Sequence, residues 1–233
     1  MIGDGVGADR ADSFEPRAAT APEACRDRED GSPADELLRE LLRLEATGLR
    51  RKAREKAAAL VALVPTLDEK RAWTGRYLGG LPQNGAGRIR HELYEGIVFP
   101  ALRHGFERGD AEACHLLGVT WNNFAVHPSF SEQIGWHSAY AFHRKAYALD
   151  PGNPRYGRSL LASLIGRLRY TFHEWPSGIV LDGRDMASGF WEVGEEIAMA
   201  ASLDRGGDHS ETLAGWAGHF EAYARRRRDD GST

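Results

Sequence analysis

The stretch from Ala139 to Pro151 reads AYAFHRKAYALDP and decides the fold. Ala139 and Ala146 occupy positions i and i+7, which lie on one face of an α-helix. Pro151 ends this helix, because proline donates no backbone hydrogen bond and disfavours the helical conformation in the residue before it. The stretch therefore predicts an amphipathic helix that stops at a proline turn.

Apolar residues spaced by three and four positions recur along most of the chain, and alternating strand-like stretches are nearly absent. We expect apolar side chains such as Leu49 and Leu149 to face inward. Thr47-Gly48 is expected to bend or break the first helix. The predicted fold class is all-α, with antiparallel helical hairpins. The expected helices cover 33–64, 67–79, 88–107, 110–124, 131–149, 154–172, 185–203 and 208–228.

Composition divides the chain into a tail and one domain. Residues 1–32 are rich in charged and small residues and have almost no large apolar side chains. Such a segment cannot bury enough surface to offset its ordering entropy, so we expect it to be disordered. Residues 33–229 are predicted to form a single helical-repeat domain, followed by a flexible C-terminus at 230–233.

Charge and cysteine content limit the classes of partner. The net charge of −4 gives no general attraction to nucleic acid or anionic membranes, so we expect neither as a partner. No apolar run approaches the roughly 20 residues of a membrane span. The N-terminus lacks the apolar segment of a secretory signal, and two cysteines cannot build a disulfide framework. These features predict a cytoplasmic protein; they do not predict its oligomeric state.

Residues 111–153 combine two short patterns. The first is Leu117, Gly118 and Trp121; the second is Ala139, Ala146 and Pro151. Together they resemble a tetratricopeptide repeat (TPR), a family that pairs two antiparallel helices and stacks the pairs into a right-handed superhelix. The sequence departs from the family at Cys114, at His143 and in an insertion near FAVHPSFSE. The resemblance implies a short TPR-like α-solenoid, although residues 154–203 and those from 208 onward match only loosely.

In that family the first helix of each pair lines a concave groove, where extended peptides often bind. Asparagine amides can bond a peptide backbone, and arginine offers forked donors to a carboxylate. The alternative is that Asn122-Asn123 simply ends its helix and that the arginines are solvated. The groove residues that the resemblance implies are Glu112, His115, Asn122, Asn123, Arg155 and Arg158.

Two loops, 121–136 and 170–183, are rich in aromatic residues and histidines, and stacking would place both on one rim of the array. Loops on a rigid scaffold often carry function, and tryptophan favours recognition surfaces. The alternative is that Phe124, Phe130, Trp175 and Ile179 fold back over the core, which the apolar segment 179–181 favours. The candidate binding residues of the rim are His127, Trp136, His173, Glu174 and Trp175.

Motifs for metal, cofactor or covalent chemistry are not found. Zinc sites usually show close ligand pairs such as HExxH or CxxC, and the nine histidines form neither. Phosphate-binding, dinucleotide-binding and nucleophile-elbow motifs are also missing from the sequence. We therefore predict no metal ligand, no cofactor and no catalytic residue.

Two hypotheses of function follow. The first is a non-enzymatic module that binds a protein or peptide, as an adaptor or as an inhibitor or immunity-type protein. The second is an enzyme or a substrate-binding accessory protein that uses the two loops, with His173 and Glu174 as acid–base candidates and His127 and His137 near them. An enzyme needs a closed pocket with converging polar groups, whereas an adaptor needs an open groove or patch.

Overall fold

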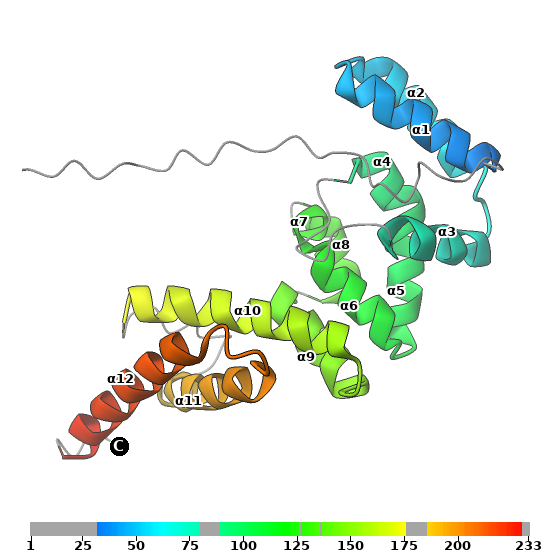
Figure 1. Cartoon of the computed structure of the whole chain (residues 1–233). Coiled ribbons are helices and arrows are strands. Elements are labelled where there is room, and N and C mark those ends of the chain that lie inside the picture. The colour runs from blue at the N-terminus through cyan, green and yellow to red at the C-terminus, as the bar shows by residue number, and fades with distance from the viewer. Residues whose placement is uncertain (1–31, 80–88, 126, 136, 176–185, 230–233) are drawn as a thin grey trace, which may run out of the picture.

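The computed structural model describes residues 32–79, 89–125, 127–135, 137–175 and 186–229, and all the elements within these ranges are helical (Figure 1). The prediction of an all-α fold is therefore confirmed. The expected tail lies outside the described residues except for Ser32, and so does the segment 230–233. The helices are α1 (Pro33–Ala46), α2 (Arg50–Ala62), α3 (Leu67–Gly79), α4 (His91–Leu93), the π-helix η2 (Tyr94–Val98), α5 (Phe99–Glu107), α6 (Ala111–Val119), α7 (Trp121–Phe124), α8 (Pro128–Ile134), α9 (Ala139–Leu149), α10 (Pro154–His173), α11 (Met186–Leu203) and α12 (Ser210–Asp229).

The first hairpin begins and ends with local signals that the sequence carries. Ser32 caps α1 in a reciprocal capping box with Asp35, in which the Ser32 side chain accepts the Asp35 N–H and the Asp35 carboxylate accepts the Ser32 N–H. Thr47 ends α1, and Gly48 follows with φ of 72°, a conformation that glycine adopts without strain. The chain therefore breaks at Thr47-Gly48. Leu49 lies in this turn and is 47% exposed, contrary to the inward position expected for it.

The expected helix 88–107 begins at His91 and contains a π-helical turn. Pro100 follows that turn and has no N–H to continue the ladder. The N–H of Phe99 reaches back to the carbonyl of Tyr94, one residue further than in an α-helix. The helix then continues as α5, which packs with α3 and α6.

Two expected helices are each divided in the structure. The expected helix 110–124 ends as α6 at Val119, and Thr120 follows as its C-cap with φ of −95° and ψ of 12°. The Thr120 hydroxyl donates to the Leu116 carbonyl at 2.8 Å and also bonds Tyr94. The expected helix 131–149 is replaced by α8 and α9. Gly135, with φ of 89°, turns the chain between them, and Ser138 caps α9.

The second half of the chain is a series of helices in which each packs against the next: α9 on α10, α10 on α11, and α11 on α12. Leucines of α10 are buried against Phe190 and Val193 of α11. Leu149 ends α9 and is 47% exposed, so its predicted inward position is wrong. Figure 1 shows the chain progressing from α1 at one end to α12 at the other. Within the described ranges no helix is both long and apolar enough to cross a membrane.

Candidate functional site

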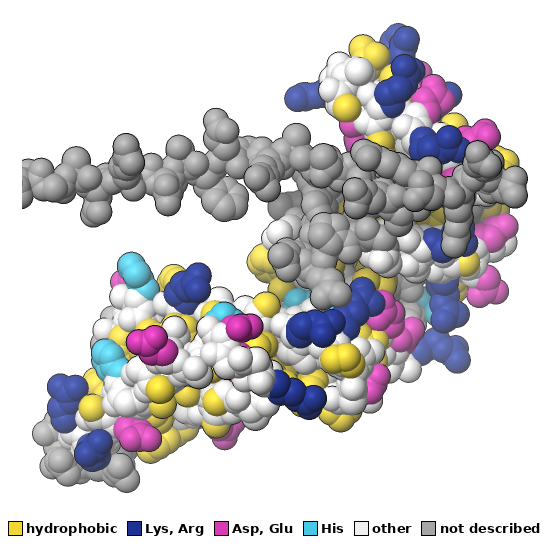
Figure 2. Space-filling model, viewed as in Figure 1, with side chains coloured by type: hydrophobic (Ala, Val, Ile, Leu, Met, Phe, Trp, Pro, Cys, Tyr) yellow, Lys and Arg dark blue, Asp and Glu magenta, His cyan; other side chains and the backbone are white. Residues whose placement is uncertain are grey.

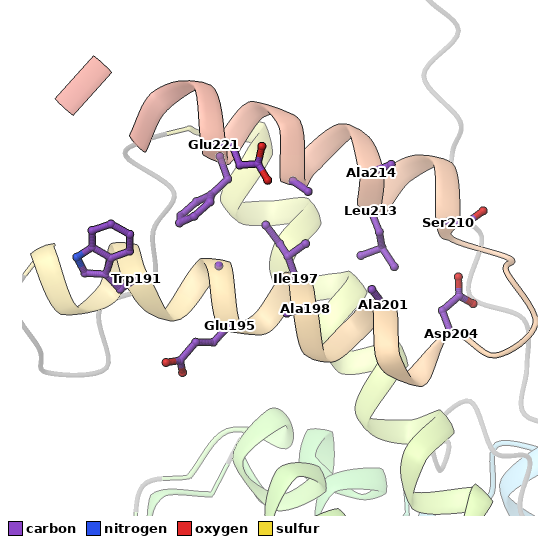
Figure 3. Close-up of a pocket in the computed structure, with 13 residues that line it drawn as sticks. Trp191, Glu195, Ile197, Ala198, Ala201, Asp204, Ser210, Leu213, Ala214 and Glu221 are labelled. Carbon is purple, nitrogen blue, oxygen red and sulfur yellow. The ribbon is translucent and has the colours of Figure 1, made fainter. Parts of the chain in front are cut away.

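A hollow in the described structure lies between α11 and α12 (Figure 3). Its volume is about 790 Å³, which is within the usual range of ligand and peptide sites. The two helices contribute residues along their facing sides. The lining residues are Trp191, Gly194, Glu195, Ile197, Ala198, Ala201 and Asp204 from α11 with its C-cap, and Ser210, Leu213, Ala214, Ala217, Phe220 and Glu221 from α12.

Small side chains make this hollow, which we call the α11–α12 groove. Ala198, Ala201 and Ala214 are exposed, so the groove is open to solvent along its length. Trp191 stands at one end of it and is 56% exposed (Figure 3). An exposed tryptophan beside an apolar floor is typical of recognition surfaces. Figure 2 shows hydrophobic side chains reaching the surface over this part of the molecule.

The charged groups that line the groove are all acidic: Glu195, Asp204 and Glu221. Asp204 accepts the His209 N–H at 2.9 Å and so orders the turn between the two helices. Glu195 and Glu221 are exposed and form no hydrogen bond or ion pair with any other described residue. The groove therefore offers an apolar floor with unneutralised carboxylates beside it.

Behind the groove, α11 is fixed to α10 by a buried ion pair. The Arg167 Nε lies 2.7 Å and 3.0 Å from the two carboxylate oxygens of Glu196. The Arg167 guanidinium also lies over the ring of Tyr140, 5.2 Å from its centre. Burial raises the pKa of Glu196, while the arginine opposes that effect. This contact holds the wall formed by α11 in place.

Three of the predicted groove residues meet elsewhere, at the junction of α6, α9 and α10. The Glu112 carboxylate accepts from Arg155 Nη1 at 2.8 Å and from the Tyr156 hydroxyl at 2.9 Å. His115 lies against Tyr156, with ring centres 5.1 Å apart. The structure therefore brings together Glu112, His115 and Arg155, but as groups that bond and pack within the chain.

Two buried histidines complete this junction. His115 is 2% exposed and His143 is 8% exposed, and their ring centres are 5.6 Å apart. His143 Nδ1 shares a hydrogen bond with the Ser163 hydroxyl at 2.8 Å. Burial lowers the pKa of His143 to about 4; burial, with Arg155 and His143 nearby, lowers that of His115 to about 3. Both rings are therefore neutral at neutral pH.

The other predicted groove residues do not join this junction. Asn123 is buried, and its side-chain oxygen accepts the Ile89 N–H at 2.7 Å, which anchors the segment before α4. Asn122 and Arg158 are exposed. The two asparagines thus face in different directions, and only one of them is accessible.

The predicted rim residues are also separated. His127 stacks on His91 with ring centres 4.1 Å apart, and Trp136 lies outside the described residues. His173 and Glu174 form an exposed pair at 2.7 Å at the end of α10. Figure 1 shows that end of α10 well apart from α7 and α8, so the two loops do not share a rim where they are described.

Two aromatic residues of these loops, Phe130 and Trp175, turn inward, whereas Tyr170 is 60% exposed. Phe130 is 3% exposed, and it contacts the rings of Tyr94 and Phe99. Trp175 stacks on Phe172 with ring centres 4.9 Å apart and packs against α12. Phe130 and Trp175 therefore act as caps over the core, while Ile179 lies outside the described residues.

Within the described ranges, no three His, Cys, Asp or Glu side chains are grouped so that they could hold a metal ion. No family model, curated protein or solved structure matches this chain. The assignment of a function therefore rests on the geometry of the described residues. The α11–α12 groove is not among the sites predicted from the sequence. The available signal was the run of Gly194, Ala198 and Ala201 at helical spacing beside Trp191.

Proposed function

We propose that the chain is a non-enzymatic helical-repeat module, a TPR-like array that binds a protein or peptide as an adaptor or inhibitor. The observation that carries this proposal is the α11–α12 groove, which is open, about 790 Å³ in volume and apolar along its floor. A groove of this kind fits a segment of polypeptide better than it fits a small polar substrate.

The packing order of the helices supports the TPR-like part of the proposal. From α5 onward the larger helices contact one another in chain order, and α10 reaches back to α6 through Arg155 and Tyr156. In a stacked array each helical pair contacts only its neighbours, which leaves long surfaces available for a partner. The groove lies between the last two helices of this series.

The polar junction of α6, α9 and α10 supports the same view of where binding occurs. Its carboxylate and arginine bond each other, and its two histidines are buried. A partner could reach the two histidines only by opening the interface between the helices, and it would have to compete with an internal ion pair for Glu112 and Arg155. The groove needs no such opening, because its alanines and Trp191 are already exposed.

The test is affinity capture with the full chain as bait from an extract of its native cells, followed by hydrogen exchange with the purified partner. We expect one protein to be recovered in stoichiometric amount and to slow exchange in α11 and α12. The result that would overturn the proposal is recovery of a metabolite or a metal ion with no stoichiometric protein. A stoichiometric partner that protects only residues far from α11 and α12 would overturn the placement of the site.

A further inference from the structure

The α6–α9 pair shows how this chain uses a seam of small residues between two helices. Cys114 of α6 and Ala146 of α9 are fully buried at their crossing. Tyr156 of α10 packs on both, so a third helix covers the seam. Small residues let that third helix approach closely, as in ridge-and-groove packing.

The α11–α12 pair has the same kind of seam without a covering helix among the described residues. Gly194, Ala198 and Ala201 of α11 and Ala214 and Ala217 of α12 line the groove, and the Phe220 ring lies against Gly194. On the neighbouring face α11 is covered by α10, through Phe190, Val193 and their partners. By analogy with the first pair, the shape that fits the open seam is a helix. The groove spans Trp191 to Asp204, about 20 Å at 1.5 Å per residue, which corresponds to nearly four helical turns.

The charges beside the seam define the chemistry of that helix. Glu195 and Glu221 lie on the two sides of the groove with no partner in the described part of the chain, and no lysine or arginine is among the lining residues. Lysine or arginine on the occupant would pair with these carboxylates, and an exposed tryptophan such as Trp191 also attracts a cation to its ring face. Two copies of this groove placed face to face would bring like charges together, which disfavours a symmetric dimer through it.

We propose that the α11–α12 groove binds a basic amphipathic helix of a partner protein, with the apolar face of that helix on the alanine seam and its cations on Glu195 and Glu221. The inference rests on the proposed function and names the class of partner. Anchors at positions i, i+3 or i+4 and i+7 of the bound helix would meet the floor between Ala198 and Ala217.

The probes that test this inference are two synthetic 14-residue helical peptides with the same leucine pattern, one carrying lysine and the other glutamate at all polar positions. Binding to the full chain is followed by the fluorescence anisotropy of a label on the peptide. We expect the lysine peptide to bind at least about tenfold more tightly than the glutamate peptide, and added salt to reduce the difference.

Charge reversal examines the role of the two carboxylates. The double variant Glu195→Lys/Glu221→Lys is expected to reverse the preference, so that the glutamate peptide binds better. Glu55→Lys/Glu132→Lys is the matched control, because these residues are exposed and lie on α2 and α8. It changes the net charge equally and should keep the original preference. Equal binding of both peptides to the wild type, or equal effects of the two double variants, would overturn the inference.

Filling the seam examines the role of its shape. Ala198→Gln/Ala214→Gln adds bulk without charge and should weaken the lysine peptide at least about tenfold, since the apolar floor is then blocked. The matched control is Ala148→Gln/Ala162→Gln, at exposed alanines of α9 and α10. Sedimentation of the wild type is measured alongside. A dimer that only the groove variant dissociates would overturn the inference, because a second copy would then be the occupant.

The two proposals fail in different ways. If the peptides show no charge preference while a native partner still protects α11 and α12 from exchange, the basic-helix inference fails and the protein-binding function stands. If no protein partner is recovered and neither peptide binds, the binding function itself fails.

Discussion

The seam between α6 and α9 and the seam between α11 and α12 are built from similar small residues, but the first is buried and the second is exposed. Cys114 and Ala146 are fully buried beneath Tyr156, whereas Ala198 and Ala214 are exposed. The difference comes from the following helix, because α10 returns across the first seam and no described helix crosses the second. A run of small residues therefore becomes core or surface according to what packs on it.

The polar groups of the two regions differ in the same way. In the closed junction Glu112 bonds both Arg155 and Tyr156, as buried or partly buried polar groups must find partners. In the open groove Glu195 and Glu221 remain available to solvent. Closing a seam thus ties its polar groups to the fold, and leaving it open keeps them for binding.

The largest expected change in the free energy of unfolding comes from lowering the pH, which acts on the two buried histidines of the closed junction. His115 and His143 have pKa values lowered to about 3 and about 4 in the folded chain, against about 6.5 when unfolded. The unfolded chain therefore binds protons first as the pH falls below 6.5, and stability declines until the folded values are reached. We expect the two histidines together to lower the free energy of unfolding by about 4 kcal/mol between pH 7 and pH 5, at about 1.4 kcal/mol per pH unit for each histidine.

Urea unfolding at pH 7, 6 and 5 measures this decline. His143→Gln should remove about half of the pH dependence, because one titrating ring is then missing. The raised pKa of Glu196 has the opposite effect, because it stabilises the folded chain as the pH falls. Glu196 is present in both proteins, so the difference between their pH dependences measures the contribution of His143. The same pH dependence in the wild type and in His143→Gln would contradict the burial of this ring.

The second effect concerns how closely the helices of the closed junction approach. A Cβ added at Gly118 would overlap the imidazole ring of His143, which is buried and bonded to Ser163. We expect Gly118→Ala to reduce the free energy of unfolding by about 3 kcal/mol, because neither helix can move away without opening the seam. Gly166→Ala is the control on α10, where a new Cβ meets nothing within 4 Å.

Gly166→Ala should stabilise the chain by about 0.5 to 1 kcal/mol, since alanine costs less backbone entropy in a helix. Thermal or urea unfolding of the two variants gives the comparison directly. If both alanines had the same effect, the close packing of α6 on α9 would not exist in solution.

The sequence was sufficient for the parts of the fold that depend on local signals. Helix 67–79 has the bounds expected from its pattern, and Ser32-Pro33 starts α1. Contacts between distant residues decided the rest. The expected helix 110–124 breaks at Thr120, whose hydroxyl bonds Tyr94 of a distant helix. The side chain of Asn123 is buried and accepts the Ile89 N–H.

The predicted groove residues and the α11–α12 groove also differ in how far the sequence could predict them. The resemblance implied that Glu112 and Arg155 line one groove, and they do meet, but each satisfies the other. The α11–α12 groove was missed because alanines give no periodic hydrophobic signal as strong as that of leucine or phenylalanine. Whether such a seam is covered depends on the path of the whole chain, which a single sequence does not state.

A third prediction measures the bond that ties α10 to α6. Tyr156→Phe removes the hydroxyl that donates to Glu112 and keeps the ring that covers the seam. We expect a loss of about 1 kcal/mol in the free energy of unfolding, typical of one hydrogen bond whose acceptor retains a second donor, here Arg155. Tyr170→Phe, at a tyrosine 60% exposed on the same helix, should change stability by much less. Equal effects of the two variants would show that the bond to Glu112 contributes nothing.

The smallest expected change in the free energy of unfolding comes from substitutions in the open groove, and the same substitution in the closed seam gives the direct comparison. Ala198→Gln/Ala214→Gln places two larger side chains where the structure has solvent, so the free energy of unfolding should change by no more than about 0.5 kcal/mol per site, from helix propensity alone. The same substitution at Ala146, which is fully buried in the closed seam, should cost at least about 3 kcal/mol by overpacking and by burying an amide. Urea unfolding of both variants tests the pair. A large loss from the groove variant would mean that another part of the chain already covers α11 and α12, and the groove would then be interior like its counterpart.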